Sequence, residues 1–210
     1  MLVRDVMTYN VVTVPSTMPV LEAERLLEAH KFERLPVADK GKLVGLVTKD
    51  TLLKASPSPA TSLSRGELLY VLSKLTVKEI MKKNVVTVTP DSTIERATEI
   101  AQENRVGCLV VLEGERVAGI LTTNDIFYKV VNPLFGIGEK GKRIIVYGAA
   151  EVEQMQKVFD CVKKIGLKIK TLWHPAGTEK KDLILHLETE DIGKLVSELK
   201  KQGFSTEERS

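Results

Sequence analysis

The fold is decided by a stretch that occurs twice, first as Val3-Arg4-Asp5-Val6-Met7 followed by Asn10-Val11-Val12-Thr13-Val14. It returns as Val77-Lys78-Glu79-Ile80-Met81 followed by Asn84-Val85-Val86-Thr87-Val88. Aligned without a gap, residues 3–55 and 77–129 share 12 identities in 53 positions. Neither copy alone can bury its apolar face, so we expect the two to pack together about a pseudo-twofold axis. Such a junction contains two related clefts, where we expect a ligand.

Composition limits the class of protein. The 210 residues suffice for one or two domains, and with 43% hydrophobic but 5% aromatic residues the cores must be aliphatic. The 31 basic and 28 acidic residues are intermixed, which argues against a nucleic-acid partner. Cys108 and Cys161 have no metal-ligand spacing and fit a reducing compartment. Without a signal peptide or an apolar run near the ~20 residues of a membrane span, we expect a cytoplasmic protein with no membrane partner.

Both copies predict the same order of elements. In the first, a β-branched strand precedes a helix with Ser16 or Thr17 as its cap and Pro19 in its first turn. In the second, Asp91 and Ser92 cap the corresponding helix. Two further strands and a short helix follow in each copy. The predicted strands of the two copies cover residues 11–14, 35–38, 43–48, 109–112 and 117–122.

Two segments interrupt this pattern. Residues 56–59 read Ser-Pro-Ser-Pro, a stiff stretch that is unfavourable for helix. Five leucines between residues 63 and 75 then predict an amphipathic helix, which is either a connecting segment or a contact to a partner. Three glycines within residues 133–142 predict a hinge, because the Lys-Ser/Thr ending of a phosphate-binding loop is missing.

Residues 143–210 predict the order β-α-β-β-α-β, which is the ferredoxin-like pattern. The predicted strands cover 144–147, 167–173 and 183–187, with an end strand near Phe204. We expect Trp173 to anchor a hairpin around residues 175–177. His186 alternates with Leu185 and Leu187, so we expect it to face solvent or an interface. The fold class is therefore α/β (α+β), with a duplicated unit followed by a ferredoxin-like domain.

The duplicated unit resembles the CBS domain, which works as a tandem pair called a Bateman module. The resemblance covers about residues 1–130. It is carried by the Val-x-x-x-Met starts, the Asn-Val-Val-Thr-Val strands, Arg34-Leu35-Pro36-Val37 and Gly107-Cys108-Leu109-Val110. The last part looks like an ACT domain, and the combination resembles the acetoin utilization protein B family. The implied domains are CBS motif 1 with its linker helix (1–74), CBS motif 2 (75–132), a hinge (133–142) and an ACT-like domain (143–210).

The resemblance also implies a cleft for an adenosine nucleotide, built from three segments of one copy. An Asp carboxylate can accept hydrogen bonds from both ribose hydroxyls, while a Thr hydroxyl and helix N-terminal amides suit phosphate. In the second copy the base would be held by Asn84, Val85, Val86, Val106, Gly107 and Cys108. The ribose and phosphate would be held by Thr122, Thr123, Asn124 and Asp125.

The first copy departs from this pattern because Thr51 stands where the ribose-binding Asp is expected. The resemblance therefore implies a weaker second site, formed by Asn10, Val11, Val12, Arg34, Leu35, Pro36, Thr48, Lys49 and Thr51. A purely structural interpretation remains open for both copies. Thr122 and Asp125 also make a natural helix cap, and Asn10 and Asn84 are natural turn residues.

The sequence has no nucleophile elbow, Walker motif or His/Glu metal signature, so we predict neither an enzyme nor a metal site. We predict a non-catalytic regulatory homodimer that senses an adenosine-containing metabolite and acts on an unknown regulated enzyme. AMP, ADP or ATP are favoured, with NAD and S-adenosylmethionine as further candidates. By resemblance, the process is acetoin or related carbon metabolism. The alternative is a ligand-free scaffold that acts through its CBS dimer and ACT-like sheet.

Overall fold

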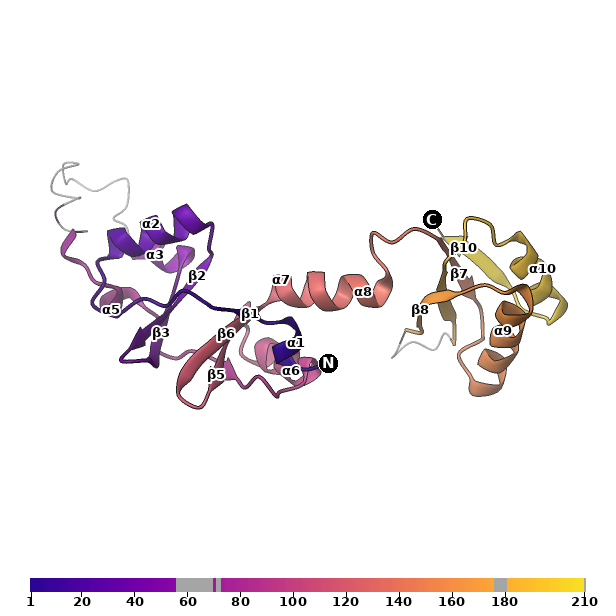
Figure 1. Cartoon of the computed structure of the whole chain (residues 1–210), viewed down its shortest axis with the longest axis horizontal. Coiled ribbons are helices and arrows are strands. Elements are labelled where there is room, and N and C mark those ends of the chain that lie inside the picture. The colour runs from indigo at the N-terminus through magenta and orange to yellow at the C-terminus, as the bar shows by residue number, and fades with distance from the viewer. Residues whose placement is uncertain (56–69, 71–72, 176–180, 210) are drawn as a thin grey trace. The chain divides into compact units, whose positions relative to one another are not determined.

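The computed structural model describes residues 1–55, 70, 73–175 and 181–209, which divide into two compact units, Met1–Ile126 and Phe127–Ser210 (Figure 1). Each unit combines helices with its own sheet, which confirms the predicted mixed α/β class. The Ser-Pro stretch at 56–59, four of the five leucines and residues 176–177 of the expected hairpin lie outside the described residues. The glycine-rich segment 133–142 belongs to the second unit.

The two copies in the first unit have matching elements, and their strands form one sheet in the order β2-β3-β6-β5-β4, with β1 paired to β6. The first copy contains α1 (Val3–Val6), β1 (Thr8–Tyr9), α2 (Val20–His30), β2 (Arg34–Asp39), β3 (Lys42–Thr48) and α3 (Lys49–Ala55). The second contains α5 (Val77–Ile80), β4 (Thr87–Val88), α6 (Ile94–Glu103), β5 (Cys108–Glu113), β6 (Arg116–Thr122) and α7 (Thr123–Ile126).

Some local predictions in this unit were wrong. Residues 11–14 are not a strand, because Val14 makes only an isolated bridge to Val37. Pro19, without a side-chain hydrogen bond, is the N-cap of α2, and Thr93 rather than Asp91 or Ser92 caps α6. The reason is tertiary: the segments ahead of these helices form backbone hydrogen bonds with the other copy and so fix where each helix begins.

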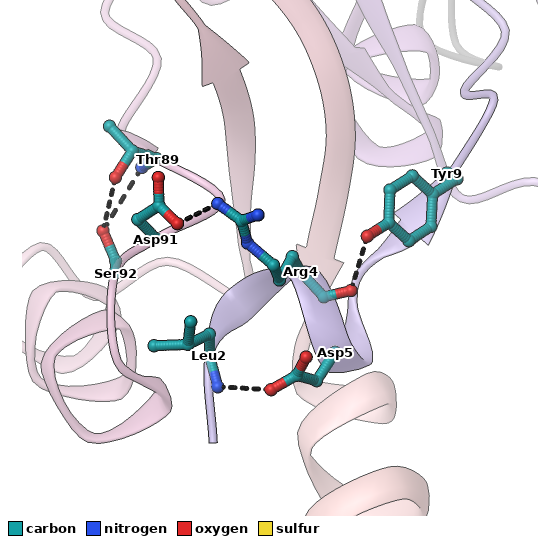
Figure 2. A network of polar contacts seen from close by, with 7 residues as sticks. All are labelled: Leu2, Arg4, Asp5, Tyr9, Thr89, Asp91 and Ser92. Atoms are coloured by element: carbon teal, nitrogen blue, oxygen red, sulfur yellow. Dashed lines mark hydrogen bonds and ion pairs between the residues drawn. The ribbon is translucent and has the colours of Figure 1, made fainter.

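The leading segment of each copy is hydrogen-bonded to the other copy. The Val3 amide donates to the Ser92 carbonyl at 2.9 Å, and the Val77 amide donates to the Met18 carbonyl at 2.9 Å. Figure 2 shows the first of these junctions, where Arg4 forms an ion pair with Asp91. In the same view the Tyr9 hydroxyl donates to the Arg4 carbonyl at 2.7 Å. The two copies are therefore interlocked by reciprocal exchange of their leading segments.

The exchanged segments then cross the sheet of the other copy. β1 pairs with β6, placing Tyr9 opposite Gly119. On the related side, Leu46 and Lys82 exchange two backbone hydrogen bonds of 2.9 and 3.0 Å. A methyl group on Gly119 would lie 2.7 Å from the Thr8 carbonyl oxygen, and one on Gly45 would lie 3.1 Å from the Lys82 carbonyl oxygen. Both copies therefore have glycine at this position, Gly45 and Gly119, because the backbone of the other copy crosses there and leaves no room for a side chain.

The second unit contains the predicted β-α-β-β-α-β order, and its sheet has the strand order β10-β7-β9-β8. Its elements are η1 (Phe127–Val131), α8 (Asn132–Phe135), β7 (Lys142–Val146), α9 (Val152–Ile165), β8 (Ile169–Trp173), β9 (Leu183–Leu187), α10 (Gly193–Lys201) and β10 (Thr206–Arg209). Fully buried aliphatic side chains such as Leu185, Leu195 and Leu199 form its core. The Trp173 ring meets the Phe135 ring edge to face at 4.8 Å.

The prediction that His186 faces solvent or an interface was wrong with respect to solvent. Its side chain is on the opposite face of β9 from Leu185 and Leu187, as the alternation requires, but it is only 1% exposed. The glycine-rich segment covers it, since a methyl group on Gly136 would lie 3.0 Å from the imidazole Cε1 atom. A strand pattern identifies the two faces of a sheet, but it does not identify what covers them.

We expect Gly119→Ala to destabilise the protein by about 1–3 kcal/mol, because the added methyl group meets the Thr8 backbone, which cannot rotate away. Urea unfolding monitored by circular dichroism measures this loss. Gly193→Ala is the matched control, since its nearest neighbour is the Asp191 side chain and the position begins a helix. It should change stability by no more than about 1 kcal/mol. Equal losses in both variants would contradict the crossing-backbone explanation.

Candidate functional site

A cleft of about 290 Å³ lies between the two copies of the first unit. The first copy contributes Glu33, Arg34, Leu46, Thr48, Lys49 and Asp50. The second copy contributes Lys82, Asn84, Val85, Val86, Arg105, Val106, Gly107 and Cys108. All six residues expected around the base in the second copy therefore line one cleft. They meet Arg34, Thr48 and Lys49, which were assigned to the weaker site.

This arrangement corrects the expectation that one cleft is built from three segments of one copy. The segment 82–86 crosses to β3 of the first copy through the Leu46–Lys82 hydrogen bonds, and Thr48 ends β3 while Lys49 and Asp50 begin α3. The residues of the second copy that were expected to hold the base are thus combined with the β3–α3 junction of the first. The exchange of leading segments is the physical cause, and it is invisible in an alignment of the copies.

The other predicted residues do not line this cleft. Thr122, Thr123, Asn124 and Asp125 lie at the β6–α7 junction, which meets β1 of the first copy. The Thr8 hydroxyl donates to the Asp125 carboxylate at 3.2 Å. Leu35 and Pro36 are buried in β2. Asn10, Val11 and Val12 follow β1, and Asn10 adopts a left-handed backbone with φ of 52°.

Asp125 and Thr51 cap their helices in the same way. The Asp125 carboxylate accepts from the Thr122 amide at 2.9 Å and from the Thr122 hydroxyl at 2.6 Å. The Thr51 hydroxyl accepts from the Thr48 amide at 2.8 Å. Asp125 and Thr51 are 8% and 9% exposed, so both side chains are directed into the protein. Both side chains therefore have hydrogen-bond partners within the protein, as the helix-cap interpretation requires.

The cleft carries an excess of positive charge. Four of its side chains are basic, Arg34, Lys49, Lys82 and Arg105, and two are acidic. Glu33 is paired with Lys49 at 2.6 Å, and Asp50 with Lys54 at 2.8 Å. The pKa of the Asp50 carboxyl is lowered by its hydrogen bond from Lys54, with help from the charge of Lys82. The cleft therefore suits a negatively charged ligand.

One wall of the cleft is made by Gly107 and Cys108. The Arg34 guanidinium lies beside Gly107, since a methyl group there would be 3.2 Å from the Nη2 atom of Arg34. Absence of a side chain allows Arg34 or a flat ligand to approach this backbone. Burial raises the pKa of the Cys108 thiol, while the cations Arg34 and Lys82 pull it down.

The sequence prediction missed Lys82 and Arg105. The repeat offers a signal for Arg105, because it aligns with Lys31 and both stand just before a middle strand. Both residues adopt a left-handed backbone, with φ of 53° and 54°. Lys82 aligns with Thr8, so nothing in the repeat marks it as a cleft residue. Its position follows from the exchange alone.

Two further kinds of feature are absent from the described ranges. No group of three or more His, Cys, Asp or Glu side chains there is placed to hold a metal ion. In the same residues, no helix has both the length and the apolar character needed to cross a membrane.

Comparison with known families agrees with the duplicated architecture. The family model described as the CBS domain matches residues 3–58 and 77–132, which together are more than half of the chain. The chain belongs to the CBS domain family. Its first unit is a tandem CBS pair, and the cleft described above lies between the two CBS motifs.

Relatives with known names share this pair. An L-aspartate semialdehyde sulfurtransferase of Methanocaldococcus jannaschii is 32% identical over 127 residues, covering 60% of this chain. An inosine-5′-monophosphate dehydrogenase of Korarchaeum cryptofilum is 34% identical over 134 residues, covering 63% of this chain. The matches span only 22% and 25% of these relatives. Both enzymes therefore resemble this chain in the CBS part alone.

Solved structures resemble the same part. A putative acetoin utilization protein (AcuB) from Vibrio cholerae has a TM-score of 0.53 and 26% identity, covering 63% of this chain and 91% of its own. The CBS domain pair of protein MJ0100, in complex with 5′-methylthioadenosine and S-adenosyl-L-methionine, has a TM-score of 0.50 and 28% identity, covering 65% and 96%. CBSX2 in complex with AMP has a TM-score of 0.51 and 26% identity, covering 62% and 96%.

The cleft electrostatics can be tested through Cys108. In a Cys161→Ser background, we expect its alkylation by iodoacetamide to follow a pKa above the ordinary thiol value of about 8.5, because burial is the largest influence. Lys82→Gln should raise this pKa further, since a cation that favours the thiolate is removed. Lys83→Gln, which changes the neighbouring charge outside the cleft lining, should leave it unchanged. A midpoint below the ordinary value would contradict the assigned environment.

Proposed function

We propose that this chain is a non-catalytic regulatory protein that binds an adenosine nucleotide between its CBS motifs. The observation that carries the proposal is a positively charged cleft, with Gly107 in one wall beside Arg34, at the junction of the two copies. AMP, ADP or ATP are the favoured ligands. Binding that differs in strength between two arrangements of the module would shift their populations and change the surface offered to a regulated enzyme.

The cleft has one part for a base and one for phosphate. Val85, Val86 and Val106 offer apolar side chains for the faces of a ring, and Gly107 lets the backbone approach it. Lys49, Lys82 and Arg105 supply the positive charge that phosphate groups need. S-adenosylmethionine carries a positive sulfonium, so this cleft should take it less well than a nucleotide. NAD, with its diphosphate, remains a candidate.

The similar structures support the chemical class of the ligand. The MJ0100 pair was solved with two adenosine derivatives and CBSX2 with AMP, and both share the fold of the first unit. Here the principal site would combine Asn84–Val86 and Val106–Cys108 with Arg34, Thr48 and Lys49. The β6–α7 junction, Thr122 to Asp125, would form the second site together with Asn10, Val11 and Val12.

The wider assignment concerns the second unit and the assembly of the chain. We propose that residues 143–210 are an ACT-like domain, joined through 133–142 to the CBS motifs at 1–74 and 75–132, in a cytoplasmic homodimer. The ferredoxin-like strand order of the second unit supports the ACT-like fold. The likeness to the putative acetoin utilization protein supports a role in acetoin or related carbon metabolism.

One observation favours the alternative, a ligand-free scaffold acting through its CBS dimer and ACT-like sheet. Large apolar side chains are exposed along and just after the helical segment that begins the second unit. Phe127, Tyr128, Leu134 and Ile137 are each at least half exposed, at 50%, 63%, 53% and 51%. Such a cluster is typical of a protein contact surface. The scaffold requires no ligand in the cleft.

A melting panel with AMP, ADP, ATP, NAD and S-adenosylmethionine separates the two functions. A nucleotide bound with Kd near 10 μM stabilises the protein by about 2.7 kcal/mol at 1 mM, which raises the melting temperature by several degrees. We expect this shift for at least one adenine nucleotide and a smaller one for S-adenosylmethionine. No shift with any of the five would favour the scaffold.

Two matched variants then locate the site. Lys82→Gln should weaken nucleotide binding about tenfold, or about 1.4 kcal/mol, because a charge-assisted contact to phosphate is lost. Lys83→Gln removes the same charge from the adjacent residue outside the cleft lining and should bind normally. Isothermal titration calorimetry measures both. Loss of binding in Asp125→Ala, with Lys82→Gln unaffected, would move the principal site to the β6–α7 junction.

A further inference from the structure

His186 is a buried histidine in the second unit that the nucleotide cleft does not use. It lies on β9, opposite Arg143 of β7 and Thr171 of β8. Its side chain is 1% exposed, and among the described residues neither ring nitrogen has a hydrogen bond of good geometry, although the Lys140 backbone lies close enough to influence its pKa. Buried imidazoles normally satisfy at least one nitrogen, so this position requires an explanation.

A glycine-rich segment, Gly136 to Gly141, closes over this imidazole. Methyl groups on Gly136 and Gly141 would lie 3.0 Å from the Cε1 and Nε2 atoms of His186, respectively. Both glycines have positive φ angles, 62° and 129°, which other residues rarely adopt. The segment therefore fits against the ring because it presents backbone, without side chains, at both places.

Three contacts attach this segment and the preceding α8 to the sheet. The Arg143 guanidinium donates to the Gly136 carbonyl at 2.5 Å. Glu139 forms an ion pair with Lys170 of β8 at 3.0 Å. The Phe135 ring meets the Trp173 ring at 4.8 Å. These contacts hold the segment closed while the imidazole under it is neutral.

We propose that His186 makes this closure sensitive to acid, so that protonation of the buried imidazole opens the Gly136–Gly141 segment. The charged groups that face the ring are Arg143 from β7, Lys170 from β8 and Glu139 from the segment itself, and the uncharged backbone of Lys140 also lies near it. Two of the three charged side chains are cations. A proton added to the ring would thus be held beside like charges and away from water.

The direction of the pH dependence follows from these surroundings. Burial, then Arg143 and Lys170, lower the pKa of His186, and the Lys140 backbone and Glu139 oppose them only in part. In the open segment the imidazole is hydrated and regains its ordinary pKa of about 6.5. The closed state is therefore fully favoured above about pH 6.5 and loses stability as the pH falls toward the lowered value. Across that interval the ratio of closed to open falls by up to tenfold per pH unit.

Opening would change the part of the chain that connects the two units. Residues 127–141 lead from the end of the CBS pair into β7, and the closed segment fixes α8 against β8. Release of the segment would separate Phe135 from Trp173 and free α8 from β8. The inference is independent of the nucleotide proposal, because all the residues involved belong to the second unit.

Hydrogen exchange on the full-length chain tests the proposal. Between pH 8 and 5.5, after correction for the intrinsic exchange rate, we expect protection of a peptide covering 136–141 to fall by up to tenfold per pH unit below about 6.5. A peptide from α9 should keep its protection. His186→Gln should abolish the pH dependence. His174→Gln alters the other histidine of the second unit, which directly follows Trp173, and should retain it.

An NMR titration of the wild-type imidazole gives a second measurement that does not depend on a variant folding. We expect the His186 resonance to follow a pKa below the ordinary histidine value. A pKa at or above that value would overturn the proposal. So would a pH-dependent loss of protection that persists in His186→Gln, because the responsible group would then be another residue.

Discussion

The structure of the CBS pair depends on the reciprocal exchange of leading segments between its two copies. α1 is bonded to the segment before α6, and α5 to the segment before α2, through backbone groups that any sequence possesses. Because the amides and carbonyls at these helix starts would otherwise be unpaired, the exchange satisfies them and fixes where α2 and α6 begin. Separation of the two copies would expose these unpaired backbone groups.

The same exchange creates the cleft. Since residues 82–86 cross onto β3, this segment of the second copy faces the helix start of the first across the cleft. The duplication thus yields two related junctions that have diverged in charge. One has Lys82 and Lys49 beside Thr51, and the other has Thr8 beside Asp125. Divergence of this kind lets two related junctions differ in charge while the backbone stays the same.

The second unit reaches stability by a different route. Its aliphatic core lies between one face of the sheet and the helices α9 and α10, whereas its other face carries His186 under a segment that meets the ring with glycine backbone at Gly136 and Gly141. A hydrophobic residue at position 186 would bury a similar area without the free-energy cost of burying a polar group. The imidazole introduces a titratable group into this contact. The rest of the contact depends on the shape of the backbone, on the hydrogen bond from Arg143 and on the ion pair of Glu139.

The sequence by itself determined the duplication, the mixed α/β class, the aliphatic cores and the β-α-β-β-α-β order, because each follows from local composition and spacing. It also identified six of the eight residues of the second copy that line the cleft, namely Asn84, Val85, Val86, Val106, Gly107 and Cys108. Only the tertiary structure decided that these residues meet Thr48 and Lys49 rather than Asp125, that Lys82 joins them, and that His186 is covered. The repeat pattern is equally consistent with pairing inside one copy and pairing between copies. Contacts between segments far apart in the chain determine that the pairing is between copies.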